Sequence, residues 1–194
     1  MMLQQSTDID RDFDRLRERI GSSDFLNNRC LANEVGFYVF PYDASKELQV
    51  RQRTAELVAD SKSGALSARV IERNLWQVFL DICQNKKILD KIPSLEQKRG
   101  SDALLARLQK IATPEVFART MDYDSHQPGR DVLLITGVGQ IYPFVRAHSV
   151  LENAQSIFED IPVVLMYPGR YDGQHLHLFD RINDGNYYRA FNIL

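Results

Sequence analysis

The sequence has 194 residues, of which 44% are hydrophobic and 26% are charged, and its formal net charge is −2. A chain of this length fits one domain, which we expect to span residues 1–194, and it buries roughly 70% of the surface that its unfolded form exposes. The small net charge excludes a global field that would attract DNA or an anionic membrane.

Cysteine usage and hydropathy indicate the compartment. Cys30 and Cys83 lie in apolar helical patterns and neither belongs to a C-x-x-C motif, so we expect buried, reduced thiols. The N-terminal segment lacks the apolar core of a signal peptide, and no apolar run is long enough to span a bilayer. The sequence therefore predicts a cytoplasmic protein that is not part of a membrane.

The chain begins with two predicted helices. Thr7 followed by Asp10 resembles a capping box, and the apolar residues behind it recur at helical spacing: Ile9, Phe13, Leu16 and Ile20. A second, short helix is expected from about residue 23 to residue 33, with Phe25, Leu26 and Leu31 packed.

Two strands are predicted next, each followed by a capped helix. The strands are GFYVFPYD (36–43) and LSARVIE (66–72), which are rich in aromatic and β-branched residues. Asp43 caps the first helix, and we expect one buried face on it: Leu48, Ala55 and Val58. Asn74 caps the second helix, which buries Leu75, Phe79 and Ile82.

From residue 75 to residue 121 the pattern stays helical, with breaks at Pro93, at Gly100 and at Thr113-Pro114, where Thr113 is the expected N-cap. Five basic residues of this segment could contact nucleic acid: Lys86, Lys87, Lys91, Lys98 and Arg99. A solvated helix face is the simpler interpretation of them. The following DYDSHQPGR (122–130) predicts a loop.

The last third alternates again between strands and a helix. VLLIT (132–136) and IPVVLMY (161–167) predict strands, residues 143–158 predict a helix, and PGRYDG (168–173) predicts a turn. NDG (183–185) predicts the turn of a terminal hairpin. Continuous apolar strands favour parallel pairing. We therefore expect an α/β fold with a mostly parallel sheet flanked by helices, a helical insertion between the second and third strands, and a C-terminal β-hairpin.

The glycine pair Gly137 and Gly139 follows a predicted strand, as glycines do in nucleotide-binding loops. A Walker A loop would need a lysine and a Ser/Thr after Gly139, and neither is present. A dinucleotide fingerprint would need a third glycine where Tyr142 stands, and an acidic residue at the end of the next strand, which ends at Met166-Tyr167. We therefore interpret the glycines as a tight strand-to-helix turn, with Pro143 at the first helical position.

Arg146 and His148 border the buried stripe at the start of the helix expected at 143–158. A cation at this end of a helix faces the positive pole of its dipole, unless an anion compensates. The candidate anions of this chain are Asp131 and Asp172, and a carboxylate supplied by a partner is the alternative.

No catalytic constellation is recognisable elsewhere. His175 and His177 form an H-x-H pattern on one strand face, but no second cluster has the spacing of metal ligands, so we predict no metal and no cofactor. The Asp122, Asp124 and His126 group is interpreted as a polar loop.

Five segments taken together resemble the BrxB family, which belongs to BREX (bacteriophage exclusion) defence systems: SSDFLNN, EVGFYVFPYD, LLITGVGQIYPFVRAHSVLENAQ, IPVVLMYPGRYDGQ and NYYRAFNIL. The resemblance implies a role in anti-phage defence, beside an adenine DNA methyltransferase, a large ATPase and a phosphatase-like PglZ protein. It implies no catalytic residues, because no activity is established for the family as a whole.

Positions that recur in the family supply the candidates for an interaction surface or a polar network: Gly137, Gly139, Tyr142, Arg146, His148, Asp172, Tyr188 and Arg189. Because no catalytic motif is recognisable, our leading hypothesis is a non-catalytic adaptor that docks other BREX proteins, with the PglZ-like protein first and the methyltransferase or the ATPase as alternatives. Two other hypotheses stay open: a nucleotide-sensing or hydrolytic enzyme with a site at the 137–148 corner, and a nucleic-acid-binding module.

Overall fold

The computed structural model describes residues 9–27, 36–186 and 190–194. Sequence predictions that lie outside these residues include the cap at Thr7, the packing of Leu31, the state of Cys30 and the last part of the helix expected at 23–33. Cys83 is buried and its thiol is free, as expected. No helix within the described ranges is long and apolar enough to cross a membrane.

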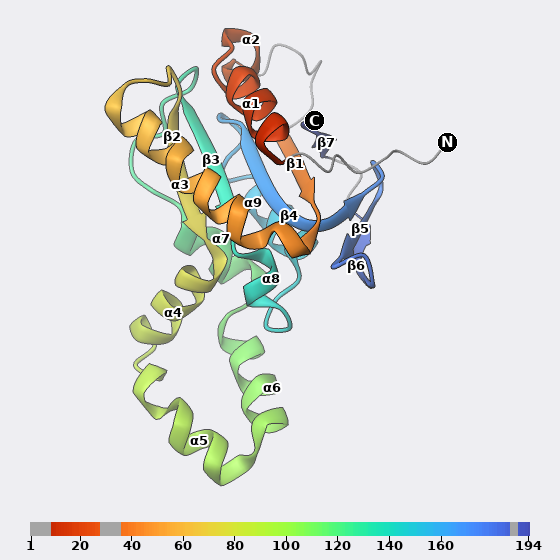
Figure 1. Ribbon diagram of the computed structural model, residues 1–194. Helices are drawn as coiled ribbons and strands as arrows, with labels where there is room; N and C mark the ends of the chain where they lie inside the picture. The colour runs from red at the N-terminus through yellow and green to blue at the C-terminus, as the bar shows by residue number, and fades with distance from the viewer. Residues whose placement is uncertain (1–8, 28–35, 187–189) are drawn as a thin grey trace.

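The core of the fold is a parallel sheet with the strand order β2-β3-β4-β1-β7 (Figure 1). Its strands are β1 (Phe37–Tyr42), β2 (Arg69–Asn74), β3 (Asp131–Thr136), β4 (Val163–Tyr171) and β7 (Phe191–Asn192). All six residues of β3 are buried, because helices cover both faces of the sheet. The predicted α/β class and the mostly parallel sheet are confirmed.

One face of the sheet is covered by α1 (Ile9–Ile20), α2 (Ser23–Leu26) and α3 (Glu47–Ser63) (Figure 1). The predicted apolar stripe of α1 is buried. The predicted face of α3 is wrong: Leu48 is 79% exposed, and the buried residues are Val50, Thr54 and Leu57. Asp43 does cap this segment, but it caps a 3-10 turn, η1 (Ala44–Lys46), which has three residues per turn, and α3 begins only after it, at Glu47.

The opposite face is covered by α4 (Leu75–Asn85), α7 (Pro114–Met121), α8 (Val138–Ile141) and α9 (Ala147–Ala154). Two of the caps are those expected from the sequence. Asn74 Oδ1 accepts hydrogen bonds from the backbone N–H groups of Trp76 and Gln77, at 3.0 and 3.2 Å, and Thr113 Oγ1 accepts one from Val116 at 3.4 Å.

The predicted insertion between β2 and β3 contains an arm that projects away from the sheet (Figure 1). The arm consists of α5 (Ile92–Arg99) and α6 (Ser101–Ile111), preceded by the 3-10 turn η2 (Leu89–Lys91). Gly100 joins the two helices with a φ of +80°, a conformation that favours glycine. The arm is anchored by Leu104 and Leu108 of α6, whereas the eight residues of α5, all described, include none that is buried.

The single helix expected at 143–158 is wrong. The chain instead forms α8, an irregular segment over residues 142–146, and α9, and the Tyr142–Pro143 peptide bond is cis. Tyr142 is extended, with φ −63° and ψ 133°, as is usual for a residue that precedes proline. Pro143 therefore separates two helices, and the N-cap of α9 is Arg146.

The C-terminal hairpin exists, but its turn is not where the sequence placed it. β4 continues through Tyr171, so the predicted turn at 168–173 is confined to residues 172–174. β5 (His175–Leu178) pairs antiparallel with β4 and with β6 (Ile182–Asn186). The turn between β5 and β6 is residues 179–181, and the predicted turn NDG (183–185) lies inside β6.

Candidate functional site

The two corner glycines fit closely against neighbouring side chains. Gly137 has a φ of +78°, and a Cβ on it would lie 2.8 Å from Asn74 Oδ1. A Cβ on Gly139 would lie 3.0 Å from the ring of Phe179 and 3.3 Å from Pro168 Cγ. Gly137 is thus required by its backbone conformation, and Gly139 lets the corner approach the β5–β6 turn.

Arg146, at the N-cap of α9, faces an anion of this chain, and the anion is Asp184 of β6. Arg146 Nη1 lies 3.5 Å from Asp184 Oδ1, and the carboxylate is only 2% exposed. The backbone N–H of Ala147 also donates a hydrogen bond to this carboxylate, and the side chain of His148 interacts with it electrostatically. A carboxylate therefore lies at the positive end of α9, where the helix dipole favours an anion.

The electrostatics of Asp184 are dominated by its burial. Burial raises the pKa of Asp184 above its usual value, although His148 and Arg146 favour the ionised form and reduce the increase. Tyr167 lies within reach as well, with its hydroxyl 3.5 Å from Asp184 Oδ2, and burial raises the pKa of Tyr167. The corner and the hairpin are thus joined through one buried carboxylate.

Tyr142 lies under the guanidinium of Arg146. The distance from Arg146 Cζ to the ring centroid is 4.9 Å, which is within cation–π range. The ring of Tyr142 holds the guanidinium in place on one side, and the Arg146 side chain is still 40% exposed to solvent.

Neither carboxylate expected to face Arg146 does so. Asp172 forms the β4–β5 turn, where its Oδ1 accepts the backbone N–H groups of Gln174 and His175 at 2.9 and 2.8 Å. These bonds lower the pKa of Asp172. Asp131 belongs to another network, at the amino end of β3. Both predictions failed because the choice between carboxylates depends on the sheet order, which brings β6 beside α9.

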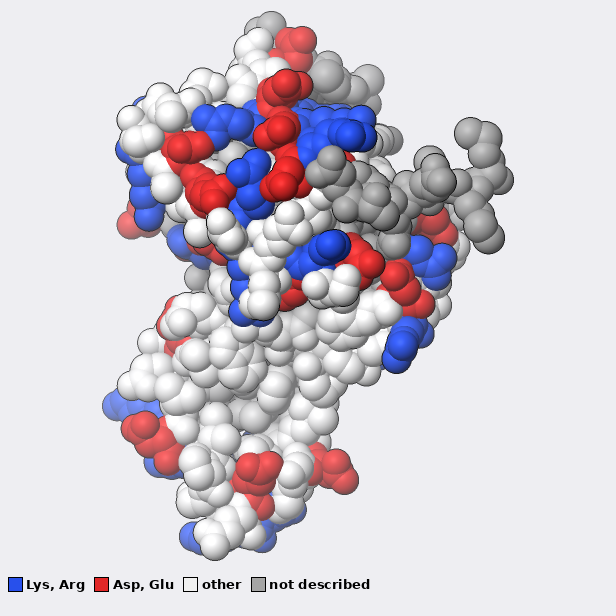
Figure 2. All heavy atoms as spheres, in the orientation of Figure 1, with Lys and Arg blue, Asp and Glu red and all other residues white. Residues whose placement is uncertain are grey.

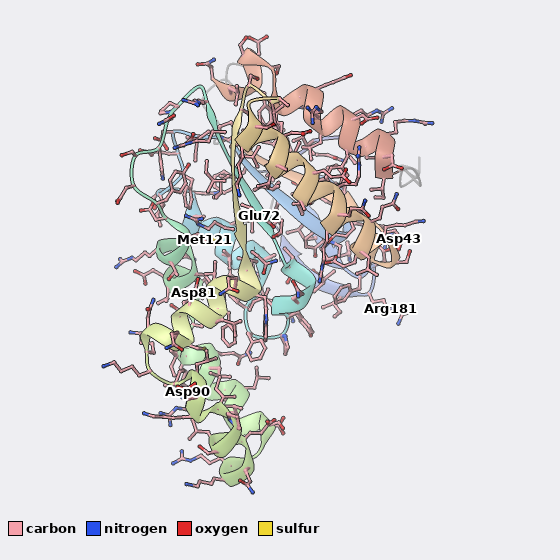
Figure 3. The ribbon with its side chains drawn as sticks, turned by 60° about the vertical axis from the view of Figure 1, so that its left-hand side comes forward. Asp43, Glu72, Asp81, Asp90, Met121 and Arg181 are labelled. Carbon is pink, nitrogen blue, oxygen red and sulfur yellow. The ribbon has the colours of Figure 1, made fainter. Side chains whose placement is uncertain are left out.

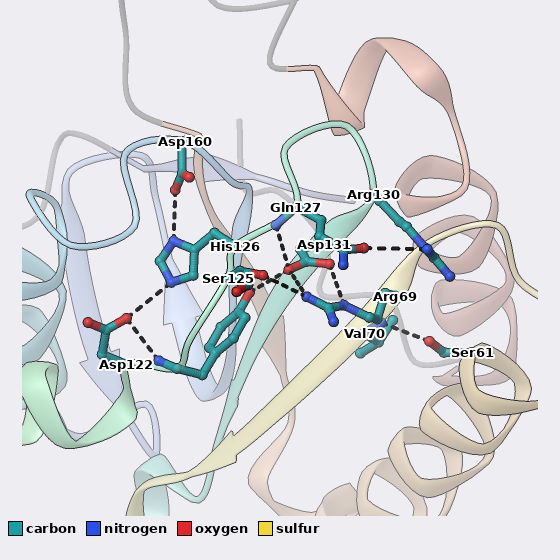
Figure 4. Close-up of polar contacts among 11 residues, drawn as sticks. Ser61, Arg69, Val70, Asp122, Ser125, His126, Gln127, Arg130, Asp131 and Asp160 are labelled. Atoms are coloured by element: carbon teal, nitrogen blue, oxygen red, sulfur yellow. Dashed lines mark hydrogen bonds and ion pairs between the residues drawn. The ribbon is translucent and has the colours of Figure 1, made fainter.

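The residues Asp122, Asp124 and His126 lie in a loop, as the sequence predicts, and beside this loop a polar network forms at the amino end of β3 (Figure 4). Asp131, fully buried, accepts hydrogen bonds from Arg69 Nε and Nη2 at 2.6 and 2.5 Å, from Tyr123 at 2.9 Å and from the Gln127 backbone at 3.0 Å. Burial alone would raise the pKa of Asp131, but the bonds from Arg69, Gln127 and Tyr123 outweigh it and lower the pKa. The network holds the 122–130 loop against the edge of the sheet.

The imidazole of His126 extends this network (Figure 4). Its Nδ1 lies 3.0 Å from Asp160 and its Nε2 lies 3.1 Å from Asp122, and the ring stacks on Phe158 with centroids 5.3 Å apart. Every member bonds another member or packs on the core, so we assign the network a structural role.

A cavity of about 410 Å³ lies at the opposite end of the sheet, where the strands have their carboxyl ends. It is bounded by α3, by the ends of β1, β2 and β3, and by the start of α4. Gly137 and Gln140 of the corner line it, together with Glu72 and Thr136, which hydrogen bond to each other at 2.8 Å. No sequence motif indicates this cavity, because its lining comes from segments that are far apart in the chain, from Tyr42 to Met166, 124 residues later.

No group of three His, Cys, Asp or Glu side chains that could hold a metal converges within the described residues. The rings of His175 and His177 lie side by side with their centroids 6.3 Å apart.

Comparison with known proteins identifies the family. The family model described as "BREX protein BrxB" matches residues 71–193. A Bacillus cereus (strain H3081.97) protein with that description is 35% identical over 189 residues, which cover 96% of this chain and 97% of the relative. The chain belongs to the BrxB family. A second BrxB, from Escherichia coli O9:H4 (strain HS), is 28% identical over 180 residues, covering 93% of this chain and 88% of the relative. No solved structure matches the chain.

Membership of the BrxB family implies a role in BREX phage defence, as the resemblance had indicated. Four of the eight family-derived candidates, Gly139, Tyr142, Arg146 and His148, lie along the corner beside the hairpin. Gly137 borders the cavity, and Asp172 lies in the β4–β5 turn. Tyr188 and Arg189 lie outside the described residues.

Proposed function

We propose that this BrxB-family protein is a non-catalytic adaptor that docks other BREX proteins. The docking surface is the corner face, which we define as residues 140–148 together with the β5–β6 turn, residues 179–181. The PglZ-like protein is the first candidate partner, and the methyltransferase and the large ATPase are the others.

The observation that carries this proposal is the state of Arg146. Its guanidinium rests on Tyr142 and contacts Asp184 through one nitrogen, Nη1, while the side chain remains 40% exposed. Among the residues that the structure describes, its other N–H donors make no hydrogen bond. An arginine held in place on a tyrosine loses little conformational entropy on binding, and Arg and Tyr are enriched among the residues that dominate interface affinity.

The surface next to α8 also suits an interface. Figure 2 shows Lys, Arg, Asp and Glu interspersed over α1 and α3 and again at the tip of the arm, with an area of few charges between them, below α8. Interface cores are depleted in charged residues other than arginine. The partner group we expect is a carboxylate, because the open donors of a guanidinium match two carboxylate oxygens.

The test is an affinity pull-down from cells that express the whole BREX gene neighbourhood, with the retained proteins measured by mass spectrometry. Arg146→Lys keeps a cation beside Asp184 but loses the planar fork, so we expect a folded protein that retains at least about fivefold less partner. Arg130→Lys is the matched control, since Arg130 is exposed at the amino end of β3. Equal retention by the two variants would refute docking through this face.

A nucleic-acid-binding module remains the second candidate, and the projecting arm favours it. Lys98 and Arg99 end α5 at the tip of the arm, away from the sheet (Figure 1). Anisotropy measurements on a labelled DNA duplex at 50 and 200 mM salt test it: phosphate contacts would give a steep loss of affinity with salt, and Lys98→Ala would reduce the slope by about one.

A further inference from the structure

The cavity at the carboxyl ends of the strands occupies the place where open α/β sheets bind ligands. The connection after β1 leaves through α3 to one face of the sheet, and the connections after β2 and β3 leave through α4 and α8 to the other. Diverging connections leave a crevice outside the strand ends, at which ligands of such sheets are commonly bound. The volume of about 410 Å³ lies within the range of small-molecule pockets.

A second observation points to a ligand. Thr54 of α3 lines the cavity and is 3% exposed, and its Oγ1 is buried without a hydrogen-bond partner among the described residues. A buried hydroxyl that makes no hydrogen bond costs free energy, so such groups are usually paired. A polar ligand in the cavity would supply the missing partner.

The polar groups around the cavity disfavour a phosphorylated ligand. Its charged side chains are Glu47, Glu72 and Arg51, and Arg51 Nε already donates to Glu47 at 2.8 Å. Two carboxylates and one engaged guanidinium leave a net negative site, which opposes the charge of a di- or triphosphate. The ligand is therefore uncharged or cationic.

Glu72 indicates which uncharged group of the ligand faces this side of the cavity. Dinucleotide-binding sheets place a carboxylate at the end of the strand beside the one that carries the glycine turn, and this carboxylate accepts hydrogen bonds from ribose. Here the glycine turn follows β3, and the neighbour of β3 in the sheet is β2, which carries Glu72 near its carboxyl end (Figure 3). The dinucleotide fingerprint predicts this residue at the end of the strand that follows the glycine turn, whereas here Glu72 lies on the strand that precedes β3 in the chain.

Trp76 provides an aromatic wall at the same cavity. Its ring is backed by Phe79 and Phe144, with centroid distances of 5.5 and 6.1 Å. Aromatic side chains of this kind bind nucleobases by stacking. We propose that the cavity binds a ribonucleoside without phosphates, with its ribose hydroxyls on Glu72, its base against Trp76, and a hydrogen bond to Thr54.

The fluorescence of Trp76, the one tryptophan of the sequence, reports on this site. We would titrate the full chain with adenosine, guanosine, cytidine and uridine, with excitation at the red edge of tryptophan absorption. We expect saturable quenching by at least one of them, binding at least about tenfold weaker for its 2′,3′-dideoxy form, and no micromolar binding of the corresponding triphosphate.

Two variants separate binding from folding. Thr54→Val should leave the unfolding midpoint unchanged or raised, because it removes an unpaired buried hydroxyl, and should weaken nucleoside binding about tenfold. Glu72→Gln should weaken binding to a similar extent, while Glu115→Gln, on the surface of α7, should not.

Three binding results would overturn the proposal, and one stability result would remove its basis. The binding results are the absence of saturable quenching by all four nucleosides, a triphosphate that binds more tightly than its nucleoside, and saturation by arginine methyl ester alone. The last would indicate a pocket for a cationic side chain. A Thr54→Val variant that is clearly destabilised would show that this hydroxyl already has a partner in the folded chain, and would remove the argument for a ligand.

Discussion

Replacing Arg69 by alanine tests whether the network at the amino end of β3 stabilises the fold. The variant removes both guanidinium bonds to Asp131, at 2.6 and 2.5 Å, and leaves a carboxylate with no exposed surface. Tyr123 and the backbone N–H of Gln127 still donate to it, at 2.9 and 3.0 Å. The buried charge is therefore under-compensated rather than fully isolated.

The magnitude follows from this geometry. Removing one partner of a buried ion pair costs about 3–5 kcal/mol. The Arg69 side chain is 37% exposed, so water can replace part of what is lost, and two donors to Asp131 remain. We expect a decrease in the free energy of unfolding of about 2–3 kcal/mol, and a decrease in Tm of about 4–12 °C for a chain of this size.

Urea denaturation followed by circular dichroism measures this change, with Arg130→Ala as the matched control. Arg130 is exposed in the same loop and makes one long contact, 3.4 Å to Gln127 Oε1, so its removal should change the free energy of unfolding by less than about 0.5 kcal/mol. A destabilisation by Arg69→Ala no larger than that of the control would refute the reasoning.

The pH dependence gives an independent test. The pKa of Asp131 is lowered in the folded state, so its contribution to stability is present above about pH 4, the usual value for aspartate, and is lost as the pH falls through the lower folded pKa. The difference between wild type and Arg69→Ala should therefore be largest near neutral pH and should shrink in acid. A constant difference would mean that the carboxylate charge is not involved.

Three further predictions concern the corner. Gly137→Ala should cost about 2–3 kcal/mol in urea denaturation, and Gly64→Ala only about 1 kcal/mol, because both glycines have positive φ but only Gly137 has close neighbours. Arg146→Ala should destabilise by about 1–3 kcal/mol at neutral pH. This destabilisation should become smaller as the pH falls. Burial already raises the pKa of Asp184, so its carboxylate becomes protonated and no longer leaves an unpaired charge in the variant. Calorimetry should detect no micromolar binding of ATP, because the corner lacks the required lysine and hydroxyl.

Features that depend on neighbouring residues could be predicted from the sequence. The caps at Asn74 and Thr113 act within three residues of their own position, so the residue type and the following apolar pattern suffice. The continuous apolar run of β3 likewise predicts, without knowledge of any other segment, that both faces of this strand are covered.

Features that depend on topology could not be predicted in this way. Arg146 meets Asp184, 38 residues further on, and Glu72 meets Thr136, 64 residues further on. Several carboxylates of the chain were chemically suitable, and only the sheet order selects among them. The position of the hairpin turn could not be predicted for the same reason. In the observed turn Phe179 and Asp180 adopt φ values of +54° and +59°, although the local sequence favours a turn at NDG. Phe179 packs against Gly139 of the corner, a contact between distant parts of the chain.

The position of β1 in the sheet has a consequence for how the protein is synthesised. β1 lies between β4 and β7, and it pairs with Val163–Pro168 on one side and with Phe191 and Asn192 on the other. A strand made early in translation must therefore wait for more than a hundred further residues before either edge is paired. During that interval its apolar side chains stay open to other chains, and non-local pairing of this kind folds slowly. We expect ribosome-bound fragments that end before residue 163 to depend on chaperones, and a chain shortened before Phe191 to keep one edge of β1 unpaired.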